Sequence, residues 1–158
     1  NWLFQLAIHV PLFVKAFDWI LLSRCLRRLF CQSQLALFSL RQQVFLIEDD
    51  HDLRQLLYLA IKSLGVEVEV FPNANSFLKT GRACDLFIID LNLPDVNGLV
   101  LCRQIKSIED TKRIPVIIIS ANPDLDKLAI ESCADDYLFK PFTIQNIKDK
   151  IRKHIKDM

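Results

Sequence analysis

The chain has 158 residues, of which 51% are hydrophobic, and its formal net charge is +1. This composition predicts a globular protein with one sizeable hydrophobic core. The first 43 residues hold five basic residues and one acidic residue, which leaves 15 basic and 18 acidic residues at positions 44–158. The larger part, with a net charge of −3, is not expected to bind nucleic acid directly, because that binding depends on cations facing phosphates.

Five cysteines are spread along the chain, an odd number without the spacing of a metal site. They are Cys25, Cys31, Cys84, Cys102 and Cys133. We interpret them as reduced thiols that mostly fill apolar space, because free cysteine is among the most buried residue types. This interpretation favours a cytoplasmic protein without structural zinc or disulfide bonds.

Residues 1–43 form a separate region that is rich in large apolar residues and contains no glycine. We expect an apolar, basic and helical extension that precedes a domain at residues 44–158. Its most apolar stretch, residues 2–22, approaches the length of a membrane span but includes Lys15 and Asp18, which are costly in hydrocarbon. Three interpretations stay open: an extension without a functional role, a membrane anchor or interfacial helix, and a helix that binds a partner.

From residue 44 onward, short apolar runs typical of strands alternate with helical patterns. Val44–Ile47 is wholly apolar, and apolar residues then recur at intervals of three and four until Gly65 ends the pattern, which predicts a strand followed by a helix. The recurring residues are Leu53, Leu56, Leu57, Ala60, Ile61 and Leu64. The valines of Val66–Val70 alternate with glutamates, as in a strand with one wet face, and Ala74, Phe77 and Leu78 predict a short helix.

The second half of the domain repeats this arrangement. Leu86–Ile89 is a wholly apolar run, and a helical pattern follows over residues 101–108. Pro115–Ile119 and Tyr137–Phe139 predict two more strands. Isoleucines at helical spacing over residues 144–155 predict the last helix.

This alternation determines the expected architecture. Five strands that alternate with five helices require parallel pairing with helices on both faces, because each crossover must return over the sheet. The fold class is therefore α/β, with a doubly wound, five-stranded parallel sheet. The wholly apolar runs should lie centrally and Val66–Val70 at an edge, since only central parallel strands are buried on both faces.

Residues of phosphoryl chemistry stand at the ends of these apolar runs. Glu48 and Asp49 follow the first run, and Asp90 follows the third. Ser120 and Lys140 follow the fourth and fifth. Because ligands of doubly wound sheets bind beyond the carboxyl ends of the strands, these side chains should meet at one edge.

Three carboxylates at one edge repel one another, so their coexistence requires either a cation or raised pKa values, and a divalent ion is the simplest explanation. Oxygen ligands without histidine or cysteine favour a hard ion, and a site that leaves positions for water and phosphate suits Mg²⁺. A carboxylate can also accept a phosphoryl group as an acyl phosphate. Asp90 is the natural acceptor, with the metal on one side and the ammonium of Lys140 on the other.

Four motifs in family order resemble the receiver domain of two-component response regulators. They are Ile47-Glu48-Asp49-Asp50, the stretch from Ile89 to Gly98, Ile119-Ser120-Ala121 and Tyr137-Leu138-Phe139-Lys140-Pro141-Phe142. The successive spacings from Asp49 to Lys140, which are 41, 30 and 20 residues, are also similar to those of the family. The resemblance covers residues 44–158.

The resemblance implies a phosphorylated aspartate and a magnesium site. Asp90 matches the position of the phosphorylated aspartate. Glu48 and Asp49 match the acidic pair that holds Mg²⁺ together with Asp90. Asn92 matches the position that contributes a backbone carbonyl to the ion.

The resemblance also implies the residues that bind the phosphoryl group and respond to it. Lys140 matches the lysine that pairs with this group, and Ser120 matches the hydroxyl residue that hydrogen-bonds it. Tyr137 matches a switch aromatic that turns inward. The family fold has the strand order 2-1-3-4-5, and Lys140-Pro141 resembles its cis peptide bond.

Other residues near these motifs have simpler interpretations. Asp50 precedes a helix, so we expect it to cap that helix rather than bind the metal. Four further aspartates are expected to face solvent: Asp95, Asp124, Asp135 and Asp136. Cys133 stands where the family usually has glycine, and a left-handed helix end there would be strained for cysteine.

These observations predict a stand-alone receiver that accepts a phosphoryl group on Asp90 from a sensor histidine kinase or a phosphotransfer protein. It would signal to a downstream protein through a phosphorylation-dependent surface, as a cytoplasmic signalling domain rather than an enzyme, with any membrane contact made by residues 1–43. One alternative is an aspartyl-nucleophile phosphatase of the haloacid-dehalogenase-like class. Asp50-His51-Asp52 resembles the nucleophile motif of that class, but it matches only the two acids of that motif. A second alternative is an interaction module that no longer depends on phosphate.

Overall fold

The computed structural model describes residues 42–82, 84–123 and 133–155. The chain divides into two compact units, residues 1–40 and 41–158, and the described residues belong to the second. Except for Gln42 and Gln43, the predicted N-terminal extension lies outside the described residues, and its helix stays a prediction. Within the described part of the chain, no helix has the length and apolar character needed to cross a membrane.

Five parallel strands form the sheet of the second unit. They are β1 (Gln43–Ile47), β2 (Glu67–Phe71), β3 (Leu86–Asp90), β4 (Val116–Ser120) and β5 (Asp136–Phe139). Their order is β2-β1-β3-β4-β5, which confirms the predicted doubly wound sheet. The apolar runs of β1, β3 and β4 are buried in its centre, whereas β2 at one edge is mostly half-buried, as predicted.

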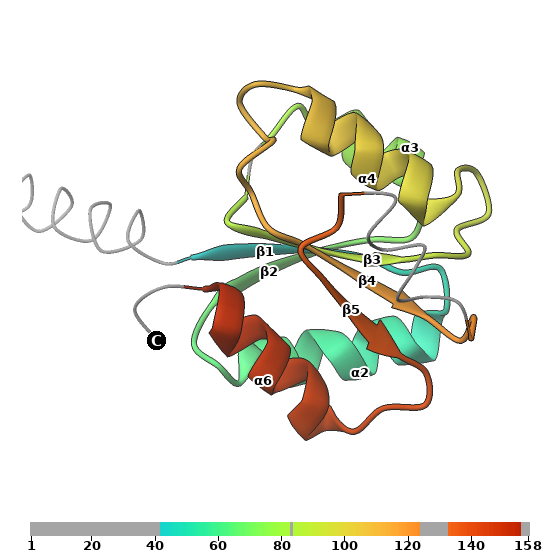
Figure 1. Ribbon diagram of the computed structural model, residues 1–158. Coiled ribbons are helices and arrows are strands. Elements are labelled where there is room, and N and C mark those ends of the chain that lie inside the picture. Colours follow the sequence, from blue (N-terminus) through green and yellow to red (C-terminus); the bar gives the residue numbers. More distant parts are fainter. Residues whose placement is uncertain (1–41, 83, 124–132, 156–158) are drawn as a thin grey trace, which may run out of the picture. The chain divides into compact units, whose positions relative to one another are not determined.

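Four helices cover this sheet in the described residues. They are α2 (His51–Lys62), α3 (Ala74–Leu78), α4 (Gly98–Ser107) and α6 (Ile144–His154). Figure 1 shows α2 and α6 on one face of the sheet and α3 and α4 on the other. The helix predicted between the fourth and fifth strands falls mainly on residues 124–132, which lie outside the described residues.

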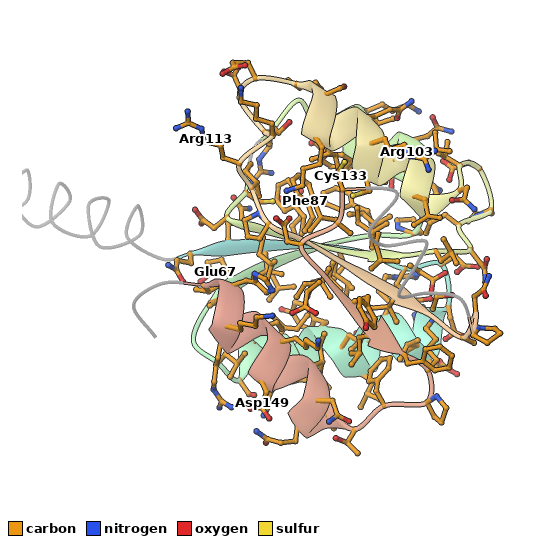
Figure 2. All side chains as sticks on the ribbon, in the orientation of Figure 1. Glu67, Phe87, Arg103, Arg113, Cys133 and Asp149 are labelled. Atoms are coloured by element: carbon orange, nitrogen blue, oxygen red, sulfur yellow. The ribbon has the colours of Figure 1, made fainter. Side chains whose placement is uncertain are left out.

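The two faces of the sheet bury different kinds of side chain. On the side of α3 and α4, aromatic rings meet edge to face with centroids 5.2–5.9 Å apart, a geometry that adds to the stabilisation from area burial. The rings are those of Phe45, Phe71, Phe77 and Phe87. Figure 2 shows Phe87 in the layer between the sheet and these helices. On the side of α2 and α6, the buried core consists of leucine, isoleucine and valine side chains.

Each described helix begins at a side chain that accepts a backbone N–H group. The carboxylate of Asp50 accepts from the N–H of Leu53 at 2.8 Å, which confirms the capping role predicted for Asp50. Asn73, Asn97 and Thr143 cap α3, α4 and α6 in the same way. Because α2 starts so soon after β1, the turn between them consists of only three residues, Glu48–Asp50.

Four apolar side chains predicted on buried helix faces are instead exposed. Leu56, Leu78, Ile108 and Ile144 are 45–53% exposed, although neighbouring apolar positions of the same helical patterns are buried. Each stands at the border of its apolar stripe or at the end of its helix, where the surface has turned away from the sheet. The apolar pattern is therefore wider than the area that the sheet covers.

The prediction that Asp136 faces solvent is wrong, because only 7% of this residue is exposed. Its carboxylate accepts hydrogen bonds from Lys150 (2.5 Å), Lys153 (2.9 Å) and His154 (3.0 Å), which share one face of α6. A carboxylate can be buried when such partners replace water. Burial alone would raise the pKa of Asp136, but these hydrogen bonds outweigh it and hold the pKa well below its usual range.

The remaining predictions for residues near the motifs have mixed outcomes. Asp95 and Asp135 are exposed as predicted, but Asp95 also accepts the first backbone N–H groups of α3, and Asp135 pairs with Lys106 at 2.5 Å. Asp124 lies outside the described residues. Cys133 has a φ of +62°, the left-handed conformation that the resemblance to a glycine position implied.

Candidate functional site

Three carboxylates come together at the carboxyl edge of the sheet. The neighbouring strands β1 and β3 pair so that Ile47 lies beside Ile89. The next residues along the two strands, Glu48 and Asp90, are therefore also neighbours. Asp49 is next in the turn. One oxygen from each of these three carboxylates lies within 4.8 Å of the others. The structure thus brings together the acidic groups that the sequence places at strand ends.

The loop after β3 fixes the carboxylate of Asp90, which is almost fully buried. The N–H of Asn92 donates to Oδ2 of Asp90 at 2.6 Å. Asn92 and Asn97 form an antiparallel bridge, and the N–H of Gly98 donates to the carbonyl of Leu91 at 2.8 Å. A Cβ atom at position 98 would lie 2.2 Å from the backbone oxygen of Asp90. Only glycine therefore allows α4 to begin this close to the strand.

Lys140 brings a positive charge from the end of β5. Its Nζ lies 2.5 Å from Oδ1 of Asp90 and 3.1 Å from Oε2 of Glu48. The peptide bond between Lys140 and Pro141 is cis, as the resemblance implied. Burial alone would lower the pKa of Lys140, but the hydrogen bond to Asp90 and the charges of both carboxylates outweigh burial and raise the pKa above its ordinary value. Lys140 is therefore a permanent cation at this site.

The site carries excess negative charge. Burial raises the pKa of Glu48 above its ordinary value, the charge of Asp90 adds to this rise, and Lys140 offsets part of it. Three ionised carboxylates and one ammonium sum to a formal charge of −2. A divalent cation would neutralise this charge. The donor set, which consists of carboxylate oxygens with Asp49 exposed at the surface, fits a hard ion such as Mg²⁺ that keeps several waters.

Ser120 and Tyr137 lie on the two strands nearest to Lys140. Ser120 ends β4 and is buried, and its Oγ accepts from the N–H of Asn122 at 3.0 Å. The N–H of Lys140 donates to the carbonyl of Ser120 at 2.8 Å, so these two residues are neighbours along the sheet edge. Tyr137 is 38% exposed, and the Nζ of Lys150 lies 5.4 Å from its ring centroid. The tyrosine side chain therefore reaches solvent in this structure.

Arg54 is a neighbour of the site that no sequence motif indicated. Its Nη1 atom donates to the backbone oxygens of Glu48 at 2.7 Å and of Asp49 at 3.0 Å. The available signal was its place near the start of the helix that follows the acidic pair. Long side chains on a helix point back toward its N-terminus, so an arginine there can reach the end of the preceding strand.

Comparison with known proteins adds a family assignment to this geometry. The model of the response regulator receiver domain family matches residues 44–152. The chain belongs to this family. Response regulator ArlR of Staphylococcus saprophyticus is 34% identical over 114 residues, which are 70% of this chain and 50% of that protein. Response regulator protein TodT of Pseudomonas putida is 33% identical over 131 residues, which are 80% of this chain and 57% of that protein.

This receiver-family chain spans about half the length of the curated relatives that it matches. Among solved structures, the receiver domain of the sensor histidine kinase PA1611 from Pseudomonas aeruginosa has a TM-score of 0.67 and 24% identity. The match covers 74% of this chain and 99% of that domain. At this level of identity the likeness shows the fold, which is the receiver fold.

Two aspartates of the receiver domain lie next to the acidic pair but do not join the carboxylate group. Asp50 caps α2 through its hydrogen bond with the N–H of Leu53. The side chain of Asp52 is fully exposed and contacts His51 at 3.2 Å. The Asp50-His51-Asp52 motif, on which the phosphatase alternative depended, therefore does not supply the clustered carboxylates of the described residues.

Proposed function

We propose that this chain is a phospho-acceptor switch of a two-component phosphorelay in the cytoplasm. Asp90 accepts a phosphoryl group from a sensor histidine kinase or a phosphotransfer protein. The observation that carries this proposal is the surroundings of the Asp90 carboxylate, which include two further carboxylates within 4.8 Å and the ammonium of Lys140 at 2.5 Å. Membership of the receiver family supports the same function.

In the proposed transfer, one carboxylate oxygen of Asp90 attacks the phosphorus atom of a phosphohistidine. A P–O bond forms, the P–N bond breaks, and the imidazole leaves with the electron pair of that bond. Both oxygens of the acceptor are held in place, Oδ2 by the N–H of Asn92 and Oδ1 by Lys140. The ammonium of Lys140 also lies where it can stabilise negative charge on the transferred group.

The acidic groups would hold the cofactor Mg²⁺. Its ligands would be the carboxylates of Glu48, Asp49 and Asp90 and the backbone carbonyl of Asn92. When bound, the ion would neutralise charge on the carboxylates and on the phosphoryl oxygens. Asp49 and Asn92 are exposed, so this side of the site is open to water and to a phosphodonor. The PA1611 receiver domain has a magnesium ion coordinated in its active-site cleft, which supports this assignment.

The signal would leave the site through Ser120 and Tyr137. The hydroxyl of Ser120 would donate a hydrogen bond to the phosphoryl group, and Tyr137 would turn inward from its exposed position. Phosphorylation would thus act as a local charge change that biases a two-state element. A downstream protein would bind the altered face between the fourth and fifth helices of the domain. The fifth helix is α6, and the expected fourth helix falls on residues 124–132, outside the described residues.

Labelling by a small phosphodonor tests the acceptor directly. The protein is incubated with radiolabelled acetyl phosphate and Mg²⁺, in parallel with the variants Asp90→Asn and Asp110→Asn. Asp110 is an exposed aspartate outside the carboxylate cluster of the described residues. Label should appear on the wild type and on Asp110→Asn, disappear with EDTA, and be absent from Asp90→Asn. Equal labelling of the wild type and Asp90→Asn would refute the assignment.

Two further measurements separate this function from its alternatives. A receiver should release almost no phosphate from phosphate monoesters over many turnovers, whereas a phosphatase would continue to release it. A partner that binds only the phosphorylated wild type supports the switch. A partner that binds the wild type and Asp90→Asn equally would instead support a phosphate-independent module.

A further inference from the structure

Arg54 donates three hydrogen bonds to the turn between β1 and α2. Its Nη1 donates to the carbonyl oxygens of Glu48 at 2.7 Å and Asp49 at 3.0 Å. Its own backbone N–H donates to the carbonyl of Asp50 at 2.9 Å. The three consecutive carbonyl groups of this turn thus all accept hydrogen bonds from one residue of α2.

These contacts hold the part of the chain that carries the acidic pair. A carbonyl oxygen turns with its peptide plane, and the plane sets the direction in which the adjacent side chains leave the backbone. Glu48 and Asp49 lie beyond the last residue of β1, outside the strand. The guanidinium of Arg54 therefore fixes two peptide planes on which the direction of both carboxylates depends.

We propose that Arg54 is a positioning residue for the cation site. It holds the main chain of Glu48 and Asp49 so that their carboxylates converge with that of Asp90. The inference rests on the proposed function, because it assigns Arg54 to the Mg²⁺ site on which phosphate acceptance depends. Residues that orient metal ligands without touching the metal typically change its affinity by about 10- to 100-fold when they are replaced.

The effect of charge and the effect of position have opposite signs at Arg54. A guanidinium next to a cation site repels the cation, so on charge alone the removal of Arg54 would strengthen Mg²⁺ binding. Loss of the two carbonyl contacts would free the turn and weaken Mg²⁺ binding. The direction of the change therefore distinguishes a positioning role from an electrostatic one.

The test is the Mg²⁺ dependence of labelling by acetyl phosphate in Arg54→Ala, Arg54→Lys and the control Arg103→Ala. Arg103 is an exposed arginine on α4, on the other face of the sheet, and its removal takes away the same charge (Figure 2). The half-saturating Mg²⁺ concentration should rise about tenfold in Arg54→Ala and less in Arg54→Lys, whose flexible ammonium replaces the contacts only in part. Arg103→Ala should match the wild type. The rate at saturating Mg²⁺ should change less than twofold in all three.

A half-saturating concentration that stays equal or falls in Arg54→Ala would overturn the inference. If Arg54→Ala is unfolded by circular dichroism, Arg54→Lys decides, and a wild-type value in that variant would again overturn it. Direct titration with Mg²⁺ in a calorimeter, without a phosphodonor, separates this result from a failure of the proposed function. A wild type that binds Mg²⁺ but takes no label would contradict phosphate acceptance, while weaker binding by Arg54→Ala would still support the role of Arg54.

Discussion

The Nζ of Lys140 and the Oδ1 of Asp90 lie 2.5 Å apart, although the two residues are separated by 50 positions in the chain. This pair places a permanent cation on one side of the proposed acceptor. It does not balance the site, because Glu48 and Asp49 bring two further carboxylates to the same place. The site therefore has an excess of negative charge, which a divalent cation would neutralise.

Mg²⁺ should raise the free energy of unfolding, because it would bind the converged carboxylates of the folded state and not the unfolded chain. At a concentration 100 times its dissociation constant, the gain should be about 2.7 kcal/mol. Asp49→Asn, which removes one proposed ligand at the surface, should lose most of this gain. Urea unfolding with Mg²⁺ or with EDTA measures both, and an equal gain in the variant would contradict the metal site.

Gly98→Ala should damage both the fold and the site. The added Cβ would lie 2.2 Å from the backbone oxygen of Asp90 and 2.9 Å from the Cα of Leu91, and backbone atoms cannot move aside cheaply. We expect a loss of about 2 kcal/mol or more in the free energy of unfolding, together with weaker Mg²⁺ binding. Chemical denaturation and magnesium titration test this.

Gly65→Ala is the matched control for that substitution. Gly65 has a φ of +83°, but no atom lies within 4 Å of the position that its Cβ would take. The backbone conformation alone should lower the free energy of unfolding by about 1 kcal/mol. Mg²⁺ binding should be unchanged, since Gly65 lies in the turn after α2, away from the site. Equal Mg²⁺ affinities in Gly98→Ala and Gly65→Ala would show that the close approach at Gly98 does not matter.

Asp136→Asn should destabilise the protein at neutral pH by about 2 kcal/mol, because it leaves Lys150, Lys153 and His154 without their shared carboxylate. The pKa of Asp136 is depressed in the folded state, so its stabilising effect is present above the unfolded pKa and is lost as pH falls toward the folded pKa. The difference from the wild type should therefore shrink below about pH 4. Urea unfolding across pH 3–7 measures it.

The control for Asp136 is Asp149→Asn on the same helix. Asp149 is exposed and pairs with Arg152 at 3.1 Å on the surface of α6, where Figure 2 shows it pointing away from the sheet. Exposed pairs of this kind contribute less than about 1 kcal/mol. A loss in Asp149→Asn as large as that in Asp136→Asn would mean that burial of the carboxylate is unimportant.

Cys133→Gly should raise the free energy of unfolding by about 0.5 to 1 kcal/mol. Cys133 has a φ of +62°, a backbone conformation that is costly for a residue with a Cβ. Glycine would remove this cost, and we expect that gain to exceed the conformational entropy that glycine adds to the unfolded chain. Cys133→Ala keeps the Cβ and should show no such gain. Thermal unfolding of both variants distinguishes an effect of the backbone conformation from an effect of losing the thiol. Equal stability of the two variants would contradict a cost of the backbone conformation at Cys133.

The strand ends of this domain could be predicted because their signal is local. Each wholly apolar run is followed by a polar residue, and parallel pairing places the carboxyl ends of the strands at one edge of the sheet. The proximity of Glu48, Asp49 and Asp90 could therefore be predicted from the topology. The cap at Asp50 could be predicted for the same reason, since the residue stands directly before a helical pattern.

Contacts that depend on distant side chains could not be predicted. Nothing beside Asp136 indicates its burial, because its cationic partners stand 14 to 18 residues later on α6. The spacing of Lys150, Lys153 and His154 puts them on one helix face, but this spacing does not show which acid they meet. Arg54 was missed because its partners are backbone carbonyls, which every residue has, so that its place near the start of α2 was the one available signal.

The register of β1 against β3 has a consequence for unfinished molecules. The acidic groups and the ammonium come from segments up to 92 positions apart, and they meet only after β1, β3, β4 and β5 have paired. A nascent or partly unravelled copy contains Asp90 but lacks its surroundings. If the proposed function is right, such a copy would not accept a phosphoryl group on Asp90.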